Sequence, residues 1–186
     1  MRKLITIAAT ALALSVGSVS AATQNFSFVG NFSGDADVQS FNFSIGSVSN
    51  VTLRSYSYAG GTMADGTIVA AGGFDPILAL WDSAGNLIQQ YDDGPDPVPS
   101  DPFTGSQFDT NLTLFGLAAG DYTATIAQYA NFAGSTLASG FSESDPFFTA
   151  LYYGCSNGQF CDVNSDNRGS YWAFDVLGVD LSLIHI

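Results

Sequence analysis

Apolar and polar residues alternate along most of the chain, and this period of two constrains the fold more than any other feature. Side chains two residues apart point to the same face of a β-strand, so the alternation predicts strands with one buried face. No stretch after residue 22 repeats its apolar residues with a helical period of about 3.6. We therefore expect an all-β protein, with alternating strands at residues 26–32, 41–45, 51–53, 112–114, 122–127 and 172–176.

Glycine, proline and asparagine mark the connections between these strands. Residues 77–81 form a continuous apolar run, as in a strand buried within a sandwich, and residues 87–91 pair back on it across a turn at 82–86. Residues 92–102 contain four prolines, which cannot donate to a β-ladder, so an exposed acidic loop is expected there. Many short strands with such turns predict one antiparallel two-sheet β-sandwich domain over residues 22–180.

The first residues have the three parts of a secretory signal peptide. Met1 to Lys3 are positively charged, an apolar run extends from Leu4 to Val16, and small residues end at Ala21. This pattern predicts a signal peptide at residues 1–21, with cleavage after Ala21 or, alternatively, after the next alanine. An uncleaved anchor is the competing interpretation, although the apolar run is short for a membrane-spanning helix.

The last six residues, 181–186, match one reading frame of the mosaic-end adapter used to prepare sequencing libraries. We interpret them as a sequencing-adapter artefact that replaces the true C-terminus, and exclude them from reasoning about the fold. A genuine apolar strand end is the alternative. The chain's single histidine, His185, lies in this segment.

Acidic residues dominate the charge. After the predicted signal peptide the chain has no lysine and two arginines, Arg54 and Arg168, against 17 acidic residues, a net charge near −15. Nucleic acids and anionic lipids are bound through lysine and arginine, so neither is an expected partner. Most aspartates are explained by turns and solubility, and we expect each arginine to pair with a neighbouring aspartate.

The two cysteines are predicted to form a disulfide. Cys155 and Cys161 flank a short segment containing Asn157-Gly158, a strong signal for a tight turn. Export implies an oxidising compartment, in which such a bridge persists. A bridge that closes so short a loop is expected to stabilise the fold by about 2 kcal/mol.

Calcium is the cofactor that the acidic residues suggest, because Ca²⁺ is bound by carboxylate, amide and carbonyl oxygens. One candidate site comprises acids near the acidic loop and the hairpin before it: Asp75, Asp92, Asp93 and Asp109. The competing interpretation is a solvated acidic loop.

A second candidate calcium site is the segment Asp162, Asn164 and Asp166, which begins like an EF-hand loop. It departs from that motif at the sixth and twelfth places, where Asn167 and Ala173 replace the expected glycine and glutamate. The competing interpretation is a polar turn after the disulfide.

Aromatic residues make up 13% of the chain, and some of them are candidates for stacking on sugars. Tyr152, Tyr153 and Tyr171 lie near the disulfide and near a long irregular stretch, residues 131–148. Loops of that length often carry function. Burial in the sandwich core is the alternative for any aromatic residue of such a fold.

No residues suggest catalysis. Nucleophilic hydrolysis needs a nucleophile with a general base, and the chain has neither a lysine after the signal peptide nor a histidine outside residues 181–186. A carboxylate-based hydrolase needs two acids across a cleft, which 17 acidic residues provide without specificity. We expect a protein that is not an enzyme, with a secreted carboxylate-based hydrolase as an alternative.

Three segments together resemble the bacterial pre-peptidase C-terminal domain. They are the run from Gly72 to Ile88, Asp92-Asp93-Gly94, and the run from Leu117 to Thr123, and the resemblance covers roughly residues 36–130. The motifs are a strand, a D-x-x-G-N hairpin and an L-x-A-G-x-Y entry to a late strand. The resemblance implies a secreted, jelly-roll-like β-sandwich.

Later segments resemble a subgroup of exported proteins that commonly end in a PEP-CTERM sorting signal, processed by exosortase systems. These segments are residues 130–133, 137–141, 147–149 and 167–176. The resemblance implies a non-enzymatic protein of the bacterial cell surface or extracellular matrix, with extracellular polysaccharide as a candidate partner. Membrane attachment would come only through a sorting tail that this sequence does not show. A calcium-dependent carbohydrate-binding module is the alternative.

Overall fold

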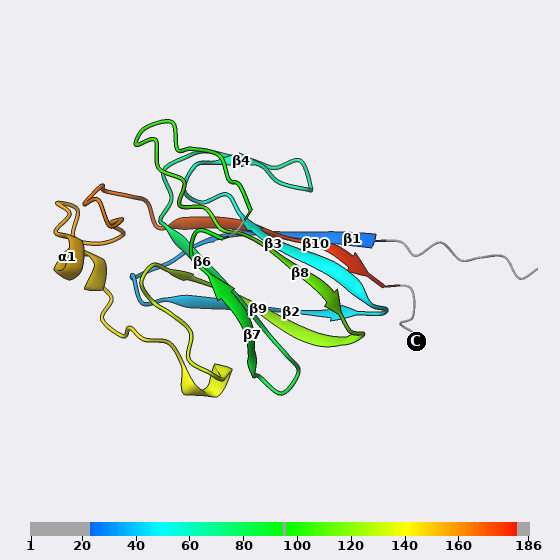
Figure 1. Ribbon diagram of the computed structural model, residues 1–186. Coiled ribbons are helices and arrows are strands. Elements are labelled where there is room, and N and C mark those ends of the chain that lie inside the picture. The colour runs from blue at the N-terminus through cyan, green and yellow to red at the C-terminus, as the bar shows by residue number, and fades with distance from the viewer. Residues whose placement is uncertain (1–22, 95, 182–186) are drawn as a thin grey trace, which may run out of the picture.

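The computed structural model describes residues 23–94 and 96–181, so the predicted signal peptide and nearly all of the predicted adapter segment lie outside the described residues. The first sheet has the strand order β1 (Thr23–Asn31), β10 (Tyr171–Asp180), β3 (Ser49–Ser55) and β8 (Asn111–Leu117). The second has the order β2 (Val38–Ile45), β9 (Gly120–Gln128), β6 (Pro76–Trp81) and β7 (Leu87–Tyr91). All these pairings are antiparallel, and the two sheets pack face to face (Figure 1). The predicted all-β, two-sheet sandwich is confirmed.

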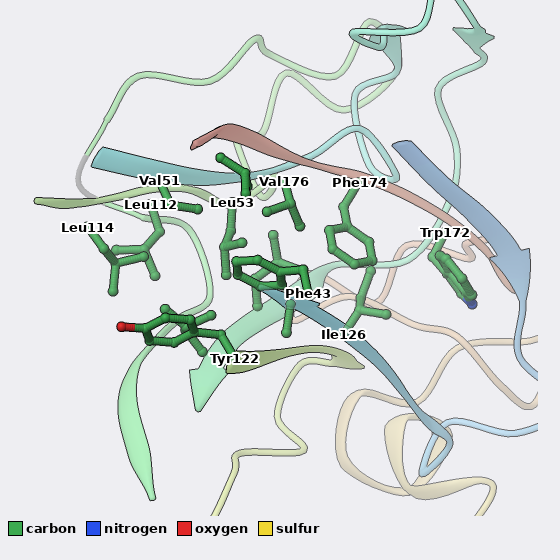
Figure 2. Packing of buried hydrophobic residues seen from close by; sticks show 14 of the residues in the cluster. Phe43, Val51, Leu53, Leu112, Leu114, Tyr122, Ile126, Trp172, Phe174 and Val176 are labelled. Atoms are coloured by element: carbon green, nitrogen blue, oxygen red, sulfur yellow. The ribbon is translucent and has the colours of Figure 1, made fainter. Parts of the chain in front are cut away.

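The alternating residues build the core between the sheets. Phe174 and Val176 of β10 and Leu53 of β3 point from one sheet toward Phe43 and Ile126 of the other (Figure 2). Each of these five side chains is at most 8% exposed. Burial of a large apolar side chain contributes about 1.5–3 kcal/mol, so this layer is the main source of stability.

Strand β6 is buried on both faces, as its continuous apolar run predicts. Leu78 and Leu80 belong to the core between the sheets, whereas Ala79 and Trp81 pack on the opposite face against Ala133. That opposite face is covered by part of the irregular stretch, in which Leu137 and Phe141 lie against the same cluster. The irregular stretch therefore acts as a third layer over β6 and the start of β7 (Leu87–Tyr91).

The glycine-rich connection contains a small hairpin that the sequence analysis did not predict. Strands β4 (Gly61–Thr62) and β5 (Ile68–Val69) pair over the outer face of the first sheet. Beneath them Tyr56, Met63 and Ala173 form a separate buried cluster. This cover explains why Tyr56 breaks the alternation of β3, which ends one residue earlier.

Two short helices also depart from the expectation of a chain without helices. The 3₁₀ helix η1 (Leu137–Ser139) lies in the irregular stretch, and α1 (Phe148–Tyr153) ends at Gly154, whose φ of 75° suits glycine. Helix α1 lies at one end of the sandwich (Figure 1). Of the described helices, none has the length and apolar character needed to cross a membrane.

The acidic segment of residues 92–102 contains no strand, as its prolines predict. It is not fully exposed, however. Asp101 is 2% exposed and Val98 is 8% exposed, because the segment folds back onto the sandwich. The expectation of a wholly exposed loop was wrong at these positions. Asp101 is held by an ion pair with Arg168, and the side chain of Gln107 donates to the carbonyl oxygen of Val98.

Candidate functional site

Three strand ends meet at the end of the sandwich that carries α1. Asp75 immediately precedes β6, Tyr129 follows β9, and Asp92 and Asp93 follow β7. Strand β6 pairs antiparallel with both β9 and β7, so the start of β6 and the ends of β9 and β7 lie at the same end of the second sheet. The backbone N–H of Tyr129 donates to the carbonyl oxygen of Asp75 at 2.9 Å, which fixes the two residues side by side.

Asp75 is the most perturbed carboxyl group at this end. Burial raises its pKa well above the ordinary value, and the charges of Asp93 and Asp92 raise it further. Its Oδ1 atom is buried and has no hydrogen-bond partner among the described residues. The pKa of Asp93 is also raised, first by partial burial and then by the charge of Asp92. Asp75, Asp92 and Asp93 thus lie at strand ends on the same end of the second sheet.

Asp109, the fourth member of the first candidate calcium site, has a different role. Its Oδ1 accepts from the Ser55 hydroxyl at 2.7 Å and from the Tyr58 N–H at 3.1 Å, and its Oδ2 accepts from the Ala59 N–H at 2.7 Å. Both oxygens are thus occupied by protein donors. Burial raises the pKa of Asp109, and these hydrogen bonds oppose the increase. Asp109 holds the chain beyond β3 in place.

The second candidate calcium site forms a turn stabilised by its own first residue. Oδ1 of Asp162 accepts from the backbone N–H groups of Asn164 and Asp166 at 2.9 and 3.0 Å. Oδ2 of Asp162 accepts from the Tyr58 hydroxyl. The side chain of Asn164 approaches Ser106 at 3.5 Å. This geometry is the side-chain-closed turn that aspartate favours, and Asp162 is engaged within it.

The acidic residues do not form a ready chelate. Within residues 23–94 and 96–181, no three His, Cys, Asp or Glu side chains are arranged so that they could together hold a metal ion. An ion bound in the described arrangement would therefore take at most two carboxylates, with neutral oxygens completing its coordination.

A row of aromatic rings crosses the same end of the sandwich. Successive ring centroids lie 5.6 Å apart from Phe132 to Tyr129, 6.4 Å from Tyr129 to Tyr153, 6.2 Å from Tyr153 to Tyr152 and 5.6 Å from Tyr152 to Phe148. We call these five residues the aromatic row. Tyr152 is 58% exposed and Phe132 is 37% exposed, whereas Phe148 is buried and anchors the row.

The aromatic row adjoins the acidic residues. The pKa of Tyr129 is raised by burial and by the charges of Asp92 and Asp75. Burial raises the pKa of Tyr153 to about 12, with further increases from Tyr129 and Asp75. Half-buried rings and acceptor oxygens therefore lie together, an arrangement suited to a ligand that has both apolar faces and hydroxyl groups.

Tyr171, the third predicted sugar-stacking residue, lies elsewhere. Its hydroxyl donates to the carbonyl oxygen of Ala70 at 2.7 Å, which ties β10 to the β4–β5 hairpin. It lines a mainly apolar groove of about 380 Å³ together with Val29 of β1 and Ile68 of β5. Tyr152 and Tyr153 are thus brought together by the fold, and Tyr171 is not part of their group.

The cysteine and arginine predictions have clear outcomes. Cys155 and Cys161 form the predicted disulfide, with Cα atoms 5.6 Å apart. Arg168 pairs with an aspartate as expected, through Nη1 and Asp101 Oδ2 at 3.3 Å. Arg54 does not: among the described residues it makes no ion pair, and its guanidinium lies 5.2 Å from the centre of the Tyr56 ring.

Sequence reasoning missed Tyr129 and Phe132. Tyr129 directly follows the alternating run of β9, and Phe132 opens the irregular stretch. The available signal was their position: an aromatic residue just past the end of a buried strand has no partner strand to cover it. Comparisons with known proteins add no further residues, because no protein-family model matches the chain and no curated protein was found to be similar to it.

Proposed function

We propose that this chain is an exported, non-enzymatic β-sandwich protein of the bacterial cell surface or extracellular matrix, delivered by an exosortase-type sorting route. The observation that carries this proposal is where the motif residues of the pre-peptidase C-terminal resemblance lie. The D-x-x-G-N segment forms the turn between β6 and β7, and the L-x-A-G-x-Y segment forms the turn between β8 and β9.

The side chains in these two turns give the motifs a physical role. Asp82 accepts from the N–H groups of Ala84 and Asn86 at 2.9 and 2.8 Å and so closes the first turn. The Tyr122 hydroxyl donates to the Ala118 carbonyl at 2.8 Å and closes the second. A tyrosine that bonds back to the backbone a few residues upstream is a recurrent corner of β-sandwiches. These contacts support the resemblance to the pre-peptidase C-terminal domain, whereas the proposed sorting route depends on the resemblance of the later segments.

The test of this proposal is to sequence the source DNA beyond codon 180. We expect the reading frame to continue into a Pro-Glu-Pro-type motif, an apolar helix and a basic tail. Fractionation of cells that express this longer chain should then find the protein at the cell surface. Cleavage of the sorting tail, and with it release of the protein from the membrane, should require the sorting enzyme. A genomic stop codon directly after Ile186 would contradict the sorting route.

A second candidate function is a calcium-dependent carbohydrate-binding module, and the aromatic row favours it. Tyr152 is 58% exposed, and the neighbouring Phe147 and Leu151 are 52% and 69% exposed, so an apolar surface lies open on α1. Exposed apolar patches of this kind mark binding sites. The hydroxyl of the exposed Tyr152 donates to the Glu143 carboxylate at 3.0 Å. An exposed ring beside an acidic oxygen suits the apolar face and the hydroxyl groups of a sugar.

Affinity electrophoresis in gels that contain extracellular polysaccharides tests this second candidate. We expect the unmutated protein to be retarded and Tyr152→Ala and Tyr153→Ala variants to migrate freely, whereas Tyr171→Ala should behave as the unmutated protein does. Absence of retardation in the unmutated protein would exclude carbohydrate binding. Release of sugar from a glycoside panel would instead support the carboxylate-based hydrolase.

A further inference from the structure

Asp75 is a buried carboxyl group with an oxygen that no protein group satisfies. The residue is 3% exposed, and Oδ1 has no hydrogen-bond partner among the described residues. Burial of an unpaired charge is so costly that such a carboxyl group takes up a proton unless it is paired or bound to a cation. Neither arginine provides that partner, because Arg168 is paired with Asp101 and Arg54 lies over Tyr56.

The surroundings of Asp75 add negative charge. Asp93 and Asp92 exert the strongest repulsion on it, and Asp162 and Asp109 contribute as well. Both oxygens of Asp162 and of Asp109 already accept from protein donors, so these two acids are engaged in holding the fold. The carboxylates that remain are those of Asp92 and Asp93, which directly follow β7.

Backbone carbonyl groups converge on the same corner. The Thr110 hydroxyl lies 2.6 Å from the carbonyl oxygen of Pro76 and 3.4 Å from that of Tyr91, and it also contacts the carbonyl oxygen of Asp92. A hydroxyl group has one proton and donates one full hydrogen bond at a time. The Thr110 hydroxyl cannot satisfy three carbonyl oxygens at once. Lone pairs of these oxygens therefore remain free of this donor, and a cation can bind them.

We propose that this corner binds a divalent cation, Ca²⁺, through the carboxylates of Asp75 and Asp93. Backbone carbonyl oxygens of the corner, among them that of Asp92, and water complete the coordination. Oxygen-only ligands suit calcium, which tolerates irregular geometry and incomplete protein coordination. Two carboxylates balance the charge of the cation. The cation removes the repulsion between Asp75 and its acidic neighbours, and it provides the partner that Oδ1 of Asp75 lacks.

The proposed ion adjoins the aromatic row, because Asp75 lies beside Tyr129 and acts electrostatically on Tyr153. A sugar stacked on these rings would have hydroxyl groups within reach of the ion. This last link rests on the proposed carbohydrate binding, whereas ion binding itself does not. The ion is therefore tested on the protein without any sugar.

The experiment compares thermal melting of the purified protein in EDTA, in CaCl₂ at about 10 mM and in NaCl of the same ionic strength. The NaCl sample is needed because any salt screens the self-repulsion of so acidic a chain. Extracellular calcium modules bind with dissociation constants of about 0.1–1 mM. We therefore expect calcium to raise the melting temperature by about 3 °C or more beyond the effect of NaCl.

Matched variants locate the site. Asp75→Asn and Asp93→Asn keep the side-chain shape and should abolish the calcium-specific increase, whereas Asp166→Asn, in the other acidic segment, should retain it. Asp93 is exposed, so its variant keeps the test valid if the buried substitution prevents folding. The proposal is overturned if calcium has no effect beyond that of NaCl, or if the increase survives in both Asp75→Asn and Asp93→Asn. Loss of the increase only in Asp166→Asn would also overturn it.

Discussion

The guanidinium of Arg168 lies 3.3 Å from the carboxylate of Asp101, and their side chains are only 3% and 0% exposed. Arg168 also donates to the carbonyl oxygens of Gly73 and Tyr58 at 3.0 and 2.7 Å, and it lies 3.6 Å from the centre of the Tyr58 ring. Arg168, in the loop before β10, thus holds two other segments in place: the acidic segment through Asp101, and the chain around the glycine-rich connection through Gly73 and Tyr58.

Substitution of Arg168 by alanine is expected to be strongly destabilising. It would leave Asp101 as an unpaired buried charge, which costs about 3–5 kcal/mol. Arg168→Lys retains the charge but not the planar set of donors, and should lose an intermediate amount. Urea denaturation followed by fluorescence measures these differences. The control is Arg54→Ala, which breaks no ion pair among the described residues and should cost less. An equal cost for both alanine variants would contradict this account.

Asp35 should be required for the docking of α1. Its Oδ2 accepts from the Thr149 N–H at 2.9 Å and from the Thr149 hydroxyl, and its Oδ1 accepts from the Phe160 N–H at 2.7 Å. Asp35→Ala removes these acceptors from buried donors and is expected to cost about 2–4 kcal/mol. Hydrogen exchange should show the largest loss of protection in α1 and near Phe160. A uniform loss across both sheets would mean that Asp35 does not act locally.

Removal of the disulfide should have a modest and mainly local effect. The bridge joins residues six apart, so the chain-entropy estimate of its contribution is about 2 kcal/mol. The double variant Cys155→Ser/Cys161→Ser should keep the β-sandwich, as judged by circular dichroism. Its free energy of unfolding, measured by denaturant titration, should be lower by about 2 kcal/mol. Unfolding of the double variant at room temperature would show that the bridge has a larger role.

Stability without calcium should fall as the pH rises above the ordinary aspartate range. Burial raises the pKa values of Asp75 and Asp109 in the folded state above the ordinary aspartate value of 3.8. Groups with raised pKa values stabilise the fold fully below their unfolded pKa, and this contribution is lost as the pH rises through the folded pKa. Denaturation in EDTA at a series of pH values measures the slope. Asp75→Asn should flatten it and stabilise the protein by about 1–2 kcal/mol at pH 7.

Asp101 acts in the opposite direction, which makes it a control for this pH dependence. Burial alone would raise its pKa, but hydrogen bonds from Arg168 and Thr104 and the charge of Arg168 lower it overall. Its contribution is therefore present above the unfolded pKa and is lost as the pH falls through the folded pKa. A stability profile that only rises between pH 4 and 7 would contradict the roles given to Asp75 and Asp109.

Much of the fold follows from local sequence patterns. The alternating residues of β2, β9 and β10 point inward as their period of two requires, and glycine and aspartate place the turn at residues 82–86 where it is observed. The spacing of Cys155 and Cys161 within a short turn segment predicted their bridge correctly. These features depend on interactions between residues close in sequence, or on which face of a strand is apolar.

Helix α1 shows why other features were not predictable. Its six residues include three aromatics and one β-branched residue, and no apolar period is visible over so short a segment. It is held by Asp35, more than 100 residues away, and by burial of Phe148. The sequence likewise indicated that Arg168 would meet an aspartate, but selecting Asp101 among 17 acids required the folded chain.

The sequence alone determined the fold class, the positions of most strands of the two main sheets, the disulfide and the strongly acidic charge. Only the tertiary structure decided which acids are engaged by protein donors and which one, Asp75, is left with an unsatisfied oxygen. The physical reason is that secondary structure depends on local periodicity, whereas a site depends on desolvation and on partners that the sheet pairing brings together. Asp75 and Tyr129 lie side by side because β6 pairs with β9, and the docking of α1 brings Tyr153 against Tyr129.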